Sequence, residues 1–390
     1  MGNITICNAQ VVLPDRILHG DVLIKEGKIA GVVPANASSF REDAPIYNAG
    51  GNYLLPGFID IHSDAVEKEI QPRPNTLFPM DFAFYELEKK LAASGITTMY
   101  HSLSLGVGLS LRGDDLLVRL VDVISGYRPK RSMIRHRIHL RYEISHLSGL
   151  PLVKQLILSG NVDYLSYMNH SPGQGQYRKP GSFEAYVMKN QGVDRDEVRE
   201  IVAKLLERQR QIDWNGLREL AELAARRNIP LASHDDDSAD KIDEALALGM
   251  SVSEFPLNLD TAKYAKQRNM HVCVGSPNIV RGGSHDNNMR AMDAIAAGAA
   301  DILCSDYYPS SLLLAVFKIA EEGYPLYQAV NMASLNPAIA LKTDRQFGSI
   351  EPGKSADLTV VELIDGYPFV RRTWVEGKVV YEADFFHSSS

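Results

Sequence analysis

The sequence has few cysteines and no long hydrophobic run. Its three cysteines, Cys7, Cys273 and Cys304, are odd in number and far apart in a chain of 390 residues. This spacing excludes a zinc knuckle and a disulfide framework, so we expect reduced thiols. No apolar stretch reaches the length of a membrane span, and no basic segment followed by an apolar one opens the chain. We therefore expect a cytoplasmic protein with no membrane partner.

Basic residues do not predominate either. There are 41 Lys and Arg against 48 Asp and Glu, a formal charge of −7. This balance argues against a nucleic-acid partner, although it leaves room for a local basic pocket. The dinucleotide-binding spacing Gly-x-Gly-x-x-Gly and the nucleophile elbow of serine hydrolases are both absent. The length and the 45% hydrophobic content are those of a soluble protein with one large and one small domain.

Both ends of the chain have the pattern of short strands. Near the N-terminus, Lys25-Glu26-Gly27 is a turn that predicts a hairpin between two of them. Chain termini often lie close together, so we predict one β-sandwich domain built from residues 1–54 and 345–390. The alternative is two unrelated caps. The predicted strands cover residues 4–6, 9–13, 21–24, 28–33, 357–361, 372–375 and 379–381.

Strands and helices alternate between residues 55 and 344, which is typical of a parallel sheet. Eight such units predict an α/β fold, a (β/α)8 TIM barrel that forms the catalytic domain. Residues 171–213 exceed one crossover and predict a lid-like insertion. The predicted barrel strands cover residues 58–62, 97–103, 137–143, 162–168, 230–234, 251–255, 271–275 and 302–306, with helical patterns between most of them.

The first barrel strand ends on two side chains that can bind metal. After the turn at Pro56-Gly57, an apolar run leads to His62 and Asp64. These two residues are two positions apart, so on a strand they point to the same side. The alternative reading is a helix-capping Asp beside a chance His.

Six of the eight predicted strand ends carry His, Asp or Glu. Active sites of barrels lie at these carboxyl ends, and mixed nitrogen and oxygen ligands suit zinc or a similar divalent ion. One or two ions are possible, since a carboxylate such as Glu143 has two oxygens to share. Any single residue could instead be an ordinary turn carboxylate. The candidate ligands are His62, Asp64, Glu143, His234, Glu254 and Asp306, with His170 as a ligand or a substrate contact.

The opening Leu-Pro-Gly-Phe-Ile-Asp-Ile-His, the strand-rich ends and the Asp on the last barrel strand resemble the amidohydrolase superfamily. Most members carry His-x-His on strand one, whereas this chain carries His62-x-Asp64. That departure, with residues 277–285 and 301–309, resembles a branch that releases pyrophosphate from a ribose 1-methylphosphonate 5-triphosphate in phosphonate catabolism. The resemblance implies a metal-dependent diphosphatase in which Asp306 takes a proton from the attacking water.

A triphosphate substrate needs positive charge and backbone N–H donors. Arg281 precedes two glycines that permit close backbone approach, which predicts a phosphate contact. The alternative for Arg281 is a turn-capping surface residue, and for Arg178 and Lys179 a solvated loop. Arg73 and Arg141 lie beside the proposed ligands. The candidate substrate-binding residues are His170, Arg178, Lys179, Arg281, His285 and Arg73.

Other functions stay open on the sequence alone. The superfamily mostly cleaves C–N bonds, so a cyclic amide hydrolase or an aminohydrolase is the alternative enzyme. A non-catalytic barrel that serves as a subunit of a larger assembly is the alternative of another class. The sequence is also compatible with a homo-oligomer and does not name the native metal.

Overall fold

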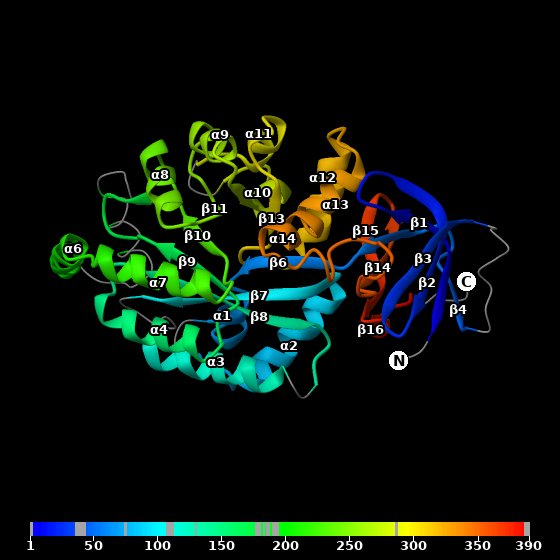
Figure 1. The fold of residues 1–390 in the computed structure, drawn as a ribbon, viewed down its shortest axis with the longest axis horizontal. Coiled ribbons are helices and arrows are strands. Elements are labelled where there is room, and N and C mark those ends of the chain that lie inside the picture. Colours follow the sequence, from blue (N-terminus) through cyan, green and yellow to red (C-terminus); the bar gives the residue numbers. More distant parts are fainter. Residues whose placement is uncertain are drawn as a thin grey trace.

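The computed structural model describes residues 3–35, 44–73, 76–106, 113–128, 131–175, 195–284 and 288–385, together with residues 181, 184 and 188. A parallel barrel and a mostly antiparallel sheet from the two chain ends lie side by side (Figure 1). Within the described residues, no helix combines the length and the apolar character needed to cross a membrane.

Eight parallel strands form the barrel in the order of the sequence. An isolated parallel bridge between Ser63 and Asp306 brings the last strand back to the first. The predicted barrel fold is therefore confirmed. The strands are β6 (Phe58–Ser63), β7 (Ile96–Leu105), β8 (Arg135–Glu143), β9 (Tyr164–Met168), β10 (Leu231–His234), β11 (Val252–Glu254), β12 (His271–Gly275) and β13 (Ile302–Cys304).

Helices follow the strands and cover the outside of the barrel (Figure 1). Several begin where the sequence supplies a capping side chain: Asp213, Ser238 and Asn258 each accept a bond from a backbone N–H three residues later. The helices are α1 (Ala65–Ile70), α2 (Met80–Ala93), α3 (Asp114–Tyr127), α4 (Leu150–Leu158), α6 (Arg195–Arg210), α7 (Trp214–Arg226), α8 (Ala239–Ala247), α9 (Leu259–Gln267), α10 (Ser276–Arg281), α11 (Ala291–Ala296), α12 (Ser311–Glu321), α13 (Leu326–Met332) and α14 (Leu335–Ala340). Helix α6 lies in the predicted insertion, whose lid role stays a prediction.

The two chain ends share one sheet, as the sequence predicts. Strand β5 from the N-terminal segment pairs antiparallel with β14 from the C-terminal segment, and Trp374 and Leu54 lie in a common buried core. This pairing excludes two unrelated caps, while the division at residues 54 and 345 stays a prediction. The strands are β1 (Ile4–Val12), β2 (Ile17–Lys25), β3 (Lys28–Pro34), β4 (Ile46–Asn48), β5 (Tyr53–Pro56), β14 (Leu358–Ile364), β15 (Tyr367–Val375) and β16 (Lys378–Glu382).

Residues 348–355 have the spacing of a phosphate-binding loop but lack its structure. The stretch leads into strand β14, whereas a phosphate-binding loop leads into a helix. The Nζ of Lys354 lies 2.7 Å from Glu351 Oε2 and 2.6 Å from Ser349 Oγ. The backbone N–H of Gly353 donates to the carbonyl oxygen of Ile29. Residues 348–355 therefore link strands of the terminal sheet, and we assign them no phosphate contact.

A buried carboxylate joins the barrel to the terminal sheet. Asp357 pairs with Arg135 at the start of β8. The same carboxylate accepts bonds from Ser355 Oγ at 3.0 Å and from the backbone N–H of Glu376 at 2.9 Å. Three donors from two parts of the fold thus converge on one side chain.

We expect Asp357→Ala to lower the free energy of unfolding by about 1–3 kcal/mol, because the substitution leaves buried donors without an acceptor. Urea denaturation measures this loss. The matched control is Asp384→Ala, which removes the 82% exposed partner of Arg371 and should cost less than about 1 kcal/mol. Equal losses in the two variants would contradict the role of Asp357.

Candidate metal centre

The chain turns sharply where three barrel strands end. Asp235, Phe255 and Asp306 follow these ends with φ of 57°, 54° and 55°. Each still donates its backbone N–H to the neighbouring strand, at 2.9–3.0 Å from the carbonyl oxygens of Glu254, Cys273 and His62 respectively. Left-handed backbone is unfavourable for residues with a Cβ, above all for a bulky Phe. The fold therefore holds strained residues at the mouth of the barrel, where function is concentrated.

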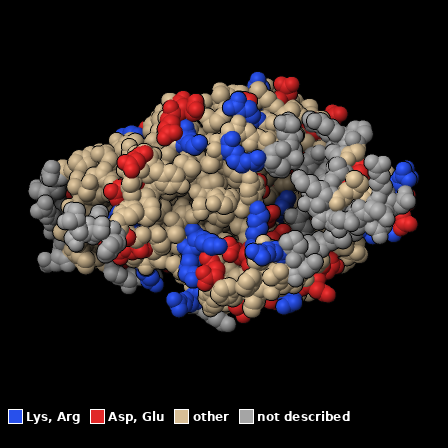
Figure 2. Space-filling model, turned by 180° about the vertical axis from the view of Figure 1, so that it is seen from behind, with Lys and Arg blue, Asp and Glu red and all other residues tan. Residues whose placement is uncertain are grey.

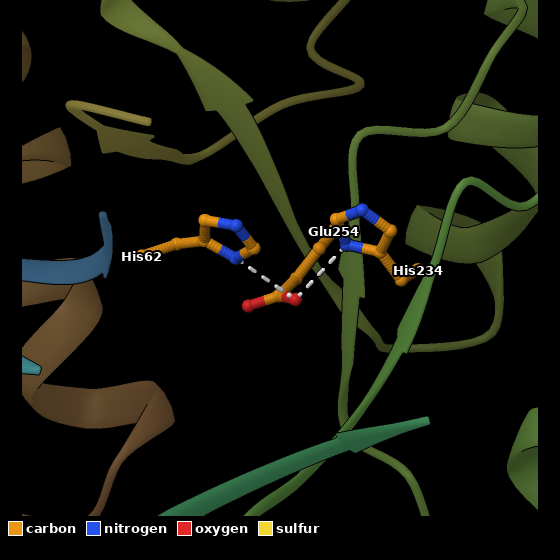
Figure 3. Close-up of side chains that lie close together, drawn as sticks. All are labelled: His62, His234 and Glu254. Carbon is orange, nitrogen blue, oxygen red and sulfur yellow. Dashed lines mark hydrogen bonds and ion pairs between the residues drawn. The ribbon is translucent and has the colours of Figure 1, made fainter. Parts of the chain in front are cut away.

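His62, His234 and Glu254 converge inside this mouth (Figure 3). One oxygen of Glu254, Oε2, lies 3.1 Å from His62 Nδ1 and 3.3 Å from His234 Nδ1. The two rings stack with centroids 5.3 Å apart. One potential ligand atom from each residue lies within 4.8 Å of the others. Two imidazole nitrogens and a carboxylate oxygen are ligands that zinc takes, so these residues fit a divalent ion.

A second group with the same chemistry adjoins the first and shares His234. It consists of His170, His234 and Asp235, whose potential ligand atoms also lie within 4.8 Å of one another. His170 Nδ1 lies 3.3 Å from Glu143 Oε2, and its Nε2 lies 3.6 Å from Asp235 Oδ2. Burial acts to lower the pKa of His170, but the carboxylates of Asp235 and Glu143 outweigh it and raise that pKa. The two groups together offer ligands for one or two ions.

Asp64 and Asp306 lie beside the first group. The backbone N–H of Asp64 donates to the carbonyl oxygen of Asp306 at 2.8 Å. Burial and the neighbouring Asp64 carboxylate raise the pKa of Asp306 to about 7. Asp64 makes no side-chain cap to α1, and α12 begins five residues after Asp306. The structure thus shows no helix-capping hydrogen bond by the Asp64 side chain, and Asp306 lies too far before α12 to cap it.

Comparison with known proteins identifies the family. The amidohydrolase family pattern matches residues 184–385. The chain is 34% identical over 384 residues to alpha-D-ribose 1-methylphosphonate 5-triphosphate diphosphatase of Escherichia coli (strain K12), covering 96% of this chain and 100% of that protein. The chain belongs to the amidohydrolase family. The resemblance seen in the sequence is thus confirmed.

Solved structures share the fold of this amidohydrolase over nearly its whole length. A 5-methylcytosine deaminase from Klebsiella pneumoniae has a TM-score of 0.67 at 15% identity, with 99% of this chain and 100% of the other covered. L-hydantoinase from Arthrobacter aurescens has a TM-score of 0.62 at 17% identity, with 98% and 96% covered. At such identities the likeness establishes the fold alone.

Of the predicted substrate-binding residues of this amidohydrolase, the structure places His170 in the second metal-binding group and describes two others, Arg73 and Arg281. Arg73 and Arg281 are exposed. The phosphate contact of Arg281 stays a prediction; Arg281 is the last residue of α10, and Gly282 ends that helix with φ of 80°. The left-handed glycine thus serves as a helix terminus. Arg178, Lys179 and His285 lie outside the described residues.

The sequence-based candidates omit Asp235 and give no partner for Arg141. Asp235 was obscured by its place in a run of three Asp residues. Arg141 is 6% exposed, and its Nη2 lies 2.9 Å from His234 Nε2. The signal for Arg141 was its alternation with Glu143 on β8, because positions two apart on a strand face the same side.

A layer of hydrogen bonds below the centre orients Glu254. Tyr164 donates its hydroxyl to Glu254 Oε1 at 2.9 Å, which leaves Oε2 to face His62 and His234. His139 lies 3.8 Å from the same Oε1 and is held by Ser102 and Ser166. Burial acts to raise the pKa of Glu254, but His139 and His234 outweigh it, so the pKa falls. The carboxylate is therefore ionised and fixed in direction.

We expect His234→Ala to lose bound metal, because His234 belongs to both candidate groups. Elemental analysis of the purified protein measures the loss. His271→Ala is the matched control, since His271 pairs with Asp301 outside the centre, at 2.8 Å. Full metal content in His234→Ala would refute the assignment.

Tyr164→Phe removes one hydroxyl and no carbon atom from beneath Glu254. We expect metal affinity to fall about 10–100-fold, as is typical when an outer partner of a ligand is lost. Titration against a chromogenic chelator gives the dissociation constant. An unchanged constant would show that Glu254 needs no such support.

Proposed function

We propose that this amidohydrolase is a metal-dependent diphosphatase acting on alpha-D-ribose 1-methylphosphonate 5-triphosphate. It would release pyrophosphate and leave the 5-phosphate, in phosphonate catabolism. The observation that carries the proposal is the match to the Escherichia coli diphosphatase, which extends over the full length of that protein. The buried groups of His and carboxylate ligands support metal dependence. Zinc as the native metal, a cytoplasmic location and the oligomeric state stay predictions.

Different residues of the centre would bind the ion and accept the proton in the proposed reaction. His62, His234 and Glu254 would hold an ion, with His170 and Asp235 available for a second. When bound, such an ion polarises a phosphoryl oxygen and makes a water more acidic. Asp306 would accept the proton of the attacking water at its carboxylate, and a pKa of about 7 suits a base that works near neutral pH.

The distribution of surface charge favours substrate recognition by local contacts. On the face drawn in Figure 2, basic and acidic side chains are interspersed, and both are visible in a hollow near its centre. A cavity of about 80 Å³ reaches His234 and Asp235, with Tyr167 and Trp214 among its lining residues. A phosphorylated sugar would therefore be recognised by individual side chains near the metal centre, and not by a broad basic face.

The main alternative is hydrolysis of a C–N bond. A stretch of 100 residues is 30% identical to the L-hydantoinase of Paenarthrobacter aurescens, which covers 25% of this chain and 20% of that protein. Phosphorus NMR of the metal-loaded protein with the ribose triphosphate separates the two functions. We expect pyrophosphate and the 5-phosphate as products, and no turnover of hydantoins, dihydroorotate or adenine. Turnover of one of these and not of the triphosphate would overturn the proposal, and no turnover of any would favour a non-catalytic subunit.

Asp306→Asn tests the proposed base. The amide has the shape of the carboxylate but cannot accept the proton, so pyrophosphate release should fall about 10²–10⁴-fold. Metal analysis and circular dichroism should show a loaded, folded protein. Asp293→Asn, at a half-exposed position on α11, removes the same charge outside the site and should leave the rate unchanged. Near-normal release by metal-loaded Asp306→Asn would exclude Asp306 as the base.

A further inference from the structure

A buried arginine reaches into the candidate metal centre. His139, Arg141 and Glu143 are alternate residues of β8 and face the inside of the barrel at successive heights. Arg141 is 6% exposed, and its Nη2 bonds to His234 Nε2 at 2.9 Å. Its Nε is buried and has no hydrogen-bond partner among the described residues. A buried guanidinium with unused donors calls for an acceptor that these residues do not supply.

The bond between Arg141 and His234 fixes which group donates. A guanidinium has donors only, so His234 Nε2 must be the acceptor. An imidazole that binds an ion through one nitrogen carries a proton on the other and donates it. An ion on Nδ1 would therefore place a proton on Nε2, directly facing the Arg141 donor. An ion on Nε2 would instead take the lone pair that accepts the Arg141 hydrogen bond. In either case, the hydrogen bond from Arg141 to His234 and an ion on His234 exclude each other.

We propose that Arg141 couples metal binding to phosphate binding: an ion on His234 releases its guanidinium, which then binds phosphoryl oxygens of the substrate. The inference rests on the proposed function for the anionic nature of that substrate.

The nearby carboxylates of Glu143 and Glu254 already accept hydrogen bonds from other donors. This supports a phosphoryl group of the substrate as the acceptor for Arg141. Glu143 accepts bonds from Ser145 Oγ and from the backbone N–H of His170, both at 3.0 Å, and Glu254 accepts one from Tyr164. A planar guanidinium matches two phosphoryl oxygens at once, and it is ionised at every working pH. Arg141 would thereby favour a phosphorylated substrate. A neutral amide in its place would leave the buried positive charge of Arg141 unpaired.

Arg141→Met tests the coupling through two affinities that should move in opposite directions. Zinc affinity, measured by competition with a chromogenic chelator, should rise about tenfold, because a competing cation and donor are removed. Inorganic phosphate affinity of the zinc-loaded protein, measured by calorimetry, should fall about 10–100-fold, because a charge-assisted bond is lost. A purely structural role would weaken both.

Arg137→Met is the matched control. Arg137 lies four residues earlier on β8, is paired with Asp163 at 3.1 Å, and has a side chain that is 36% exposed. This variant loses the same charge and should keep both affinities. Zinc affinity that does not rise in Arg141→Met, or phosphate affinity that does not fall, overturns the proposal.

Arg141→Lys carries the test if the Met variant fails to fold. A lysine keeps the charge but lacks the planar fork, so phosphate should bind more weakly than to the wild type. Unchanged phosphate affinity in this variant also overturns the proposal. Phosphate binding needs no turnover, so Arg141-dependent phosphate binding without pyrophosphate release from the triphosphate would refute the proposed function alone.

Discussion

The site depends on one buried carboxylate with two differently engaged oxygens. Glu254 turns Oε1 to the hydroxyl of Tyr164 and Oε2 to His62 and His234. An ionised carboxylate removed from water is costly unless hydrogen bonds and opposite charge surround it. The Tyr164 hydroxyl and the two imidazoles meet that need from three other strands. The position of Glu254 thus fixes how β6, β9 and β10 must present their side chains.

The barrel provides this arrangement because its strands close into a ring. Residues far apart in sequence become neighbours: the backbone N–H of Ser305 donates to Asp60 Oδ1, 245 positions away, and that of Asp306 donates to the carbonyl oxygen of His62. Backbone bonds of this kind set the height of each strand relative to the next. Side chains at equal heights then meet at the centre, so first-strand and last-strand residues can act on the same ion.

Much of the fold could be predicted from the sequence, since short apolar runs between turn signals are local features. The ends of those runs also located His62, His234 and Glu254. The position of Gly282 at the end of a helix could not be predicted, because a glycine after an arginine occurs equally in a loop and at a helix terminus. The partner of Arg141 could not be predicted for another reason. Its partner His234 is 93 positions away, and only the closed barrel shows that the guanidinium faces the imidazole.

The charges of the centre bear on the proposed triphosphate substrate. Five carboxylates lie in or beside the two candidate metal groups, and they repel a triphosphate unless cations balance them. Arg141 supplies one positive charge, which cannot balance five. Two divalent ions together with Arg141 would bring the fully ionised set to neutrality, whereas one ion would leave it negative. Under the proposed function, this charge balance would favour two ions, which the two ligand groups that share His234 could hold. The five carboxylates are those of Asp64, Glu143, Asp235, Glu254 and Asp306.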